Sequence, residues 1–88
     1  MEKRTGTLII RFETKDLAPQ VNAVLSRHSG IILSRLGLPG TGCGNIISLI
    51  IEGSTDGIGS LTGQLGRLRG VEVKSALFKS RENDTTNP

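Results

Sequence analysis

Aromatic side chains are almost absent from this 88-residue sequence, which contains two phenylalanines and no tryptophan or tyrosine. Domains that bind single-stranded nucleic acid stack bases on aromatic side chains, so the composition does not favour that function. The single cysteine, Cys43, cannot form an intramolecular disulfide, and it is not spaced with the single histidine, His28, as a metal-ligand set. No apolar run approaches the ~20 residues that cross a bilayer. We therefore expect no disulfide, cofactor, metal site or membrane span.

Catalytic and phosphate-binding motifs are missing as well. The sequence contains no Gly-Lys-Ser/Thr of a P-loop. The glycines of residues 40–44 precede a predicted strand, whereas a dinucleotide-binding loop follows a strand and precedes a helix. Neither a Ser-His-Asp set nor a pair of carboxylates in a plausible cleft can be assembled. We therefore do not expect an enzyme.

The chain is long enough for one small domain. Folding at this size buries only ~60–65% of the surface of the unfolded chain, so a partner subunit can contribute to stability. Eleven Lys and Arg residues oppose eight Asp and Glu, and the formal net charge of +3 is interspersed in sign. This charge permits nucleic-acid binding but does not argue for it. Because no apolar segment follows the Met-Glu-Lys-Arg start, we expect a cytoplasmic protein.

Alternating apolar and β-branched residues predict four β-strands. They cover residues 7–12, 31–36, 45–52 and 71–78. The glycine-rich residues 38–44 are expected to form a flexible loop between the second and third strands.

Two apolar stripes at helical spacing predict helices between these strands. Asp16 is expected to cap the first helix, and His28 to interact with its last carbonyl groups. The second helix follows the capping group at residues 54–56 and ends at Gly70. Three of its glycines share one side of the helix, so we expect a close approach to the sheet or to another helix there. These are Gly59, Gly63 and Gly66.

The resulting order β-α-β-β-α-β predicts an α+β, ferredoxin-like fold. Right-handed crossovers give a four-stranded antiparallel sheet in the order 4-1-3-2, with both helices on one face. We expect one domain over residues 1–79 and a disordered tail over residues 80–88, where apolar side chains are absent.

The predicted sheet has one face covered by helices and one bare face. The covered face takes Leu8, Ile10, Phe12, Ile47, Leu49, Ile51, Val73 and Leu77. The second strand could not be assigned to a face. Isoleucines on a bare central surface are typical of an interface, so we expect a homo-oligomer, a dimer or tetramer, formed through this face or through the edge strands at residues 31–36 or 71–78. The candidate interface residues are Ile9, Arg11, Ile46, Ser48 and Ile50.

Basic residues gather at one end of the predicted domain, where the first strand–helix loop, the glycine-rich loop and the turn after the second helix meet. Cationic side chains near a helix N-terminus favour a small anionic ligand. An ordinary solvated basic surface explains them equally well. The candidate ligand-binding residues are Lys15, Arg35, Asn45, Arg67 and Arg69.

Two stretches carry a resemblance to a known family: ILSRLGLP at residues 32–39 and the run over residues 45–76, with VNAVL at residues 21–25 matching the first helix. The most specific piece is TDGIGSLTGQLG at residues 55–66. Over about residues 7–79 the chain resembles the family of proposed iron-only hydrogenase system regulators, small ACT-like domains that are also similar to the ligand-binding domain of nickel-responsive repressors. The nickel-binding histidine and cysteine set is absent here.

The resemblance implies a small ACT-like regulatory domain in an iron-only hydrogenase system. We expect it to act by binding a small anionic effector, a protein partner, or both, and not to bind nucleic acid directly. The alternative is a weak nucleic-acid-binding module or a subunit of a transcription regulator, with contacts from Arg11, Arg35 and Lys74.

Overall fold

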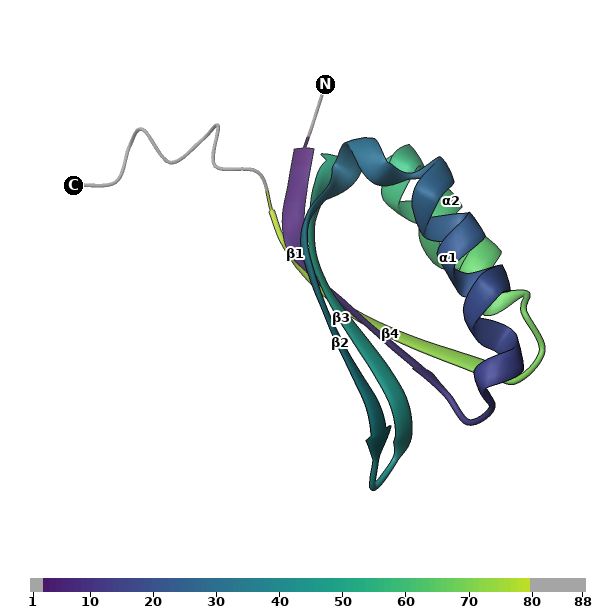
Figure 1. The fold of residues 1–88 in the computed structure, drawn as a ribbon. Coiled ribbons are helices and arrows are strands. Elements are labelled where there is room, and N and C mark those ends of the chain that lie inside the picture. Colours follow the sequence, from purple (N-terminus) through teal and green to yellow (C-terminus); the bar gives the residue numbers. More distant parts are fainter. Residues whose placement is uncertain (1–2, 80–88) are drawn as a thin grey trace.

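The computed structural model describes residues 3–79, which form one antiparallel sheet with two α-helices on one side (Figure 1). The elements are β1 (Lys3–Phe12), a 3-10 turn η1 (Lys15–Leu17), α1 (Ala18–Arg27), a 3-10 turn η2 (Ser29–Ile31), β2 (Ile32–Thr41), β3 (Gly44–Ser54), α2 (Thr55–Gly66) and β4 (Val71–Phe78). The sheet order is β2-β3-β1-β4, which is the predicted 4-1-3-2 order read from the other edge. The ferredoxin-like fold is therefore confirmed. The predicted tail at residues 80–88 lies outside the described residues.

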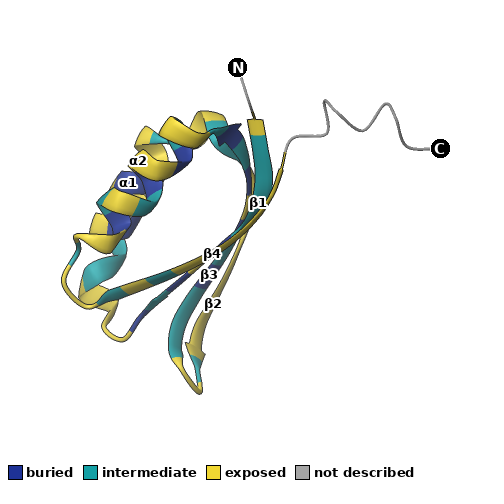
Figure 2. Ribbon diagram, turned by 180° about the vertical axis from the view of Figure 1, so that it is seen from behind, coloured by how far each residue is buried: buried dark blue, intermediate teal, exposed yellow. Residues whose placement is uncertain are grey.

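The core lies between the sheet and the two helices, where buried residues of both layers meet (Figure 2). It contains Leu8, Ile10, Phe12, Val21, Val24, Leu25, Ile47, Leu49, Ile51, Ile58, Leu61 and Leu65. From Leu8 to Phe12 in β1 and from Ile47 to Ile51 in β3, every second side chain is buried, as strand alternation requires. The prediction for Leu77 was only partly right: it pairs with Gly6 near the end of the sheet, and 37% of it is exposed.

The face of the sheet away from the helices carries no other element of the described chain, and we call it the open face. The register assigns the strand that the sequence left ambiguous: Ser34, Leu36 and Leu38 pair with open-face residues of β3. Arg35 pairs with the buried Leu49 and lies on the helix side. No helix among residues 3–79 is long and apolar enough to cross a membrane.

The starts of the two helices differ from each other. Asp16 does not cap α1: it lies inside the 3-10 turn η1, and α1 begins at Ala18 without a side-chain cap. Pro19 in the first turn needs no N–H partner there. At α2 the predicted cap is present, because Ser54 Oγ accepts a hydrogen bond from the Gly57 N–H at 3.0 Å.

The loop predicted over residues 38–44 is wrong. Pairing with β3 carries β2 through a bulge to Thr41, which pairs with Gly44, so only Gly42 and Cys43 form the turn. Thr41 Oγ1 donates to the Gly44 carbonyl at 2.6 Å and accepts from the Cys43 N–H at 3.1 Å. The positive φ of 95° at Gly44 favours glycine at this turn. Glycine content alone suggested a loop, but cross-strand pairing and these side-chain bonds stabilise a β-hairpin.

The close approach expected at the α2 glycines is also wrong. A Cβ atom at Gly59, Gly63 or Gly66 would meet nothing within 4 Å, and all three residues are exposed. The close approaches occur in the sheet instead. A Cβ at Gly6 would lie 2.8 Å from Leu77 Cα, and one at Gly53 would lie 2.7 Å from Ile31 Cγ2.

Candidate ligand-binding site

A cavity of about 390 Å³ lies between α1 and the β2–β3 hairpin. The hairpin extends past the end of β1, so its helix-facing side is not filled by a neighbouring core layer (Figure 1). The lining comes from the end of β1, η1, α1 and both hairpin strands: Phe12, Lys15, Ala18, Asn22, Arg35, Gly37, Leu38, Pro39, Asn45, Ile46 and Ile47. Its volume falls within the ~300–1,000 Å³ typical of small-molecule sites.

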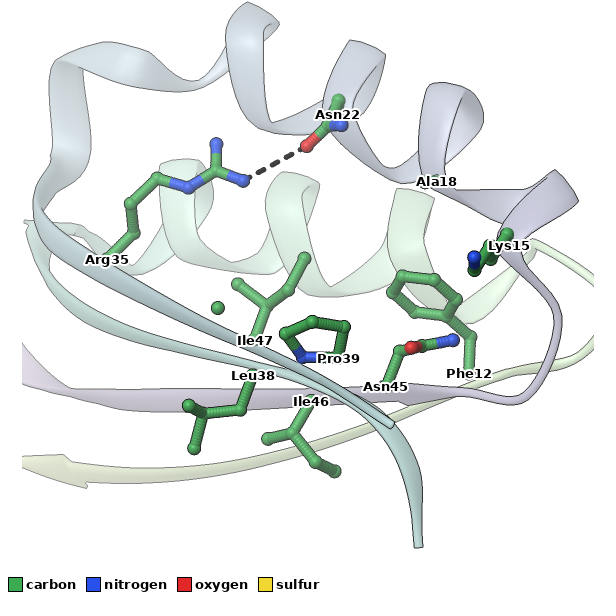
Figure 3. Close-up of a pocket in the computed structure, with 11 residues that line it drawn as sticks. Phe12, Lys15, Ala18, Asn22, Arg35, Leu38, Pro39, Asn45, Ile46 and Ile47 are labelled. Carbon is green, nitrogen blue, oxygen red and sulfur yellow. Dashed lines mark hydrogen bonds between the residues drawn. The ribbon is translucent and has the colours of Figure 1, made fainter. Parts of the chain in front are cut away.

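Lys15 and Arg35 are the charged residues of this lining, which includes no carboxylate. They lie at opposite ends of the cavity in Figure 3. Arg35 Nη2 donates to Asn22 Oδ1 of α1 at 3.0 Å, which holds the guanidinium beside the helix and leaves its other N–H groups available. Lys15 forms no ion pair with another residue in the range 3–79. The cavity is therefore electropositive.

An apolar wall separates the two cations. Phe12, Pro39 and Ile47 point into the space between the hairpin and α1 (Figure 3). Leu38 and Ile46 border the cavity through their strands, but their side chains point to the opposite side of the sheet. This combination suits a ligand with an anionic group on a carbon framework.

Asn45 holds the hairpin in place through both polar atoms of its side-chain amide. Its Nδ2 donates to the Glu13 carbonyl at 3.3 Å, and its Oδ1 accepts from the Gly40 N–H at 3.1 Å. These bonds fasten the turn end of the hairpin to the loop that precedes α1. Asn45 therefore shapes the cavity, whether or not it also touches a ligand.

The structure brings Lys15, Arg35 and Asn45 to one cavity but places Arg67 and Arg69 elsewhere. Arg67 is the C-cap of α2, and Arg69 is exposed in the turn before β4. That turn packs against the start of α1, because a Cβ at Gly70 would lie 3.0 Å from Leu17 Cδ1. The predicted basic end of the domain therefore exists, but its cations are divided between the cavity and a separate surface.

Sequence reasoning missed Asn22 and the apolar wall. Ala18 and Asn22 are four residues apart and therefore share one side of α1. This spacing could have indicated that Asn22 lies beside the cavity. Pro39 could not be assigned to the helix-facing side of the sheet, because residues 38–44 were predicted to be a loop and not part of β2.

On the open face, Arg11 is held by two acidic residues. Its Nη2 lies 2.7 Å from Glu72 Oε1, and its Nη1 lies 3.3 Å from Glu13 Oε2. The hydrogen bond from Arg11, and then its charge, lowers the pKa of Glu72. The same contact raises the pKa of Arg11. Arg11 and Lys74 share this face, whereas Arg35 lies on the helix side, so the three cations proposed for nucleic-acid contacts do not form one surface.

His28 and Cys43 were the other residues considered for catalysis or metal binding. His28 Nδ1 lies 2.8 Å from the Val24 carbonyl oxygen near the end of α1, as predicted, and Nε2 lies 3.0 Å from Ser60 Oγ of α2. Cys43 is exposed at the hairpin turn. Within residues 3–79, no group of three or more His, Cys, Asp or Glu side chains could hold a metal ion.

Comparison with known proteins connects this fold to a family. The sequence model of TM1266-like proteins, described as "Iron-only hydrogenase system regulator, putative", matches residues 4–75. The chain belongs to this family. The structure of uncharacterized protein TM1266 from Thermotoga maritima is 32% identical in sequence, with a TM-score of 0.78 over 90% of this chain and 100% of that one.

A second solved structure shows the wider fold. The ACT domain from GTP pyrophosphokinase of Chlorobium tepidum has a TM-score of 0.57 at 21% identity, over 83% of this chain and 84% of that domain. This likeness shows an ACT-like fold and nothing about its ligand. No curated protein matches the chain. Membership of a family described as regulators points to a non-catalytic role.

Proposed function

We propose that this chain is a non-catalytic regulatory domain of the cytoplasm that binds a small anionic effector in the cavity between α1 and the β2–β3 hairpin. The family assignment supports a regulatory role in an iron-only hydrogenase system. The single observation that supports effector binding is the cavity itself, which is lined by two cations and no carboxylate.

Arg35 is the residue we assign to the anionic group. A guanidinium presents a planar set of donors that matches a carboxylate or a phosphate, and the bond to Asn22 limits its rotation before a ligand arrives. Lys15 at the other end adds a second positive charge. The side chains of Phe12 and Ile47 provide apolar contact for the rest of the ligand.

The test is a thermal-shift screen against amino acids, nucleotides, other small carboxylates and phosphates, S-adenosylmethionine and divalent metals. A ligand at ~100 times its Kd adds about 2.7 kcal/mol of stability, which raises the Tm of a domain of this size by about 10 °C. Arg35→Gln should abolish the shift caused by an anionic hit. Arg69→Gln, which removes a cation outside the cavity, should preserve it.

The outcomes separate the possible functions. A hit whose shift survives Arg35→Gln refutes the assigned site. A screen without any hit refutes effector binding in this panel and favours regulation through a protein partner. Binding of duplex or single-stranded nucleic acid that weakens steeply with salt would instead favour the transcription-regulator alternative.

A further inference from the structure

We infer that a second copy of this chain covers the open face of the sheet. Both helices pack on the other face, and no described segment shields this one (Figures 1 and 2). The inference does not depend on effector binding, because Arg35 and Lys15 lie on the helix side.

The open face exposes several large apolar side chains, whereas the solvent-facing positions of a half-covered sheet are ordinarily polar. Ile9 on β1 and Ile50 on β3 are 44% and 43% exposed at the centre of the sheet. The corrected path of β2 adds Leu36 and Leu38, at 60% and 51%, and β4 ends with Phe78 at 77%. Apolar side chains thus extend across the face from one edge strand to the other.

The charges on this face compensate one another within the chain. Arg11 is paired with Glu72, and Glu52 accepts a hydrogen bond from Thr5 at 2.8 Å. The strand register places Lys3 and Lys74 on this face as well, and Glu13 contacts Arg11 there, so the face carries three cations and three carboxylates and its formal charge is zero. A neutral apolar face does not suit nucleic acid or an anionic membrane surface. It is compatible with its own copy, because neither sign of charge is present in excess to repel it.

The area is sufficient for a small dimer interface. Four strands spaced ~4.8 Å apart, with eight paired residues rising ~3.4 Å each, span about 500 Å². Two copies placed face to face therefore bury on the order of 1,000 Å², the lower bound of a specific protein interface. We expect a reversible dimer in which each copy presents the same surface about a two-fold axis.

Sedimentation velocity and light scattering over about 1–200 μM test this inference, since an interface at the small end of the range predicts dissociation within it. The wild type should change from one copy to two as concentration rises. Leu36→Glu and Ile50→Glu should each weaken association by at least about tenfold, because each places a charge in the apolar contact. Leu36 is on an edge strand and largely exposed, so its substitution leaves the core intact.

The matched control is Ala23→Glu, which adds the same charge at an exposed position of α1. It should leave the dimer unchanged, and circular dichroism should show all three variants folded. A wild type that stays monomeric at the highest concentration overturns the inference. An oligomer that persists in both open-face variants, or that Ala23→Glu also disrupts, shows that a different surface forms the contact and overturns it as well.

Discussion

Substitution of Gly63 by alanine should stabilise the protein, although this glycine lies within a segment that is highly specific to the family resemblance. Gly63 is in the interior of α2, and an added Cβ would meet nothing within 4 Å. Glycine in a helix interior costs ~0.8–1.0 kcal/mol relative to alanine. With no contact to lose, Gly63→Ala should add about 1 kcal/mol to the free energy of unfolding and about 4–8 °C to the Tm.

Far-ultraviolet circular dichroism during urea and thermal unfolding is the appropriate assay, because the chain has no tryptophan to report by fluorescence. Gly59→Ala provides an independent repeat, since a Cβ there also meets open space. Gly6→Ala is the opposing control: its Cβ would collide with the backbone of Ala76 and lie 2.8 Å from Leu77 Cα. That variant should lose more than ~1 kcal/mol, because backbone atoms of β4 must move.

A neutral or destabilising Gly63→Ala would refute this reasoning for the isolated chain. The effect should also be independent of protein concentration, since Gly63 lies on the helix layer and not on the open face. If stabilisation appeared only in dilute samples, another copy would be contacting α2 at this position. The proposed dimer geometry would then be wrong.

Two further predictions concern a surface ion pair and a helix cap. The hydrogen bond and charge of Arg11 lower the folded-state pKa of Glu72 below its ordinary 4.5, so the pair stabilises the fold above that pH and the contribution is lost as pH falls through the lowered value. Glu72→Gln should therefore flatten the pH dependence of urea unfolding below about pH 5, and an unchanged dependence would contradict the assignment. Ser54→Ala should cost about 1 kcal/mol in the same unfolding assay, because it removes the acceptor for the Gly57 N–H. Ser54→Asp should retain most of the stability, since aspartate also caps helices. Equal losses in the two variants would show that the cap is not responsible.

The fold could be predicted from the sequence because its strongest patterns agree with one another. Alternation of period two identifies β1 and β3, where every second side chain enters the core. Two helical stripes between strands then leave few topologies once crossovers are right-handed. These signals are carried by many residues, so the mistaken cap at Asp16 did not change the predicted topology.

The errors arose where one residue type was read without its neighbours. Glycines at residues 40–44 suggested a loop, but the extent of β2 is decided by cross-strand pairing with β3. The glycines of α2 suggested a tight contact, yet they face open space. Glycine reports only that a side chain is absent, and it does not say whether backbone, solvent or another molecule occupies the position.

The candidate site was partly predictable for the same reason. Lys15 and Arg35 could be nominated by charge, but Arg67 and Arg69 had the same charge and a neighbouring place in the topology. The structure separates the two pairs, because Lys15 and Arg35 line the cavity and Arg67 and Arg69 do not. Asn22 became visible only once Arg35 was known to face α1.

The extended β2 strand supplies residues to both proposed surfaces because its side chains alternate between the two sides of the sheet. Arg35 pairs with the buried Leu49 and faces the cavity, whereas Leu36 pairs with Ser48 and faces outward. Neighbouring positions on one strand thus serve a charged cavity and an apolar face without sharing a side chain. Since the sheet backbone separates them, the ligand and the second copy can be tested by adjacent single substitutions. A regulatory domain of this size can contain both functions because a sheet covered on one side has two chemically different surfaces.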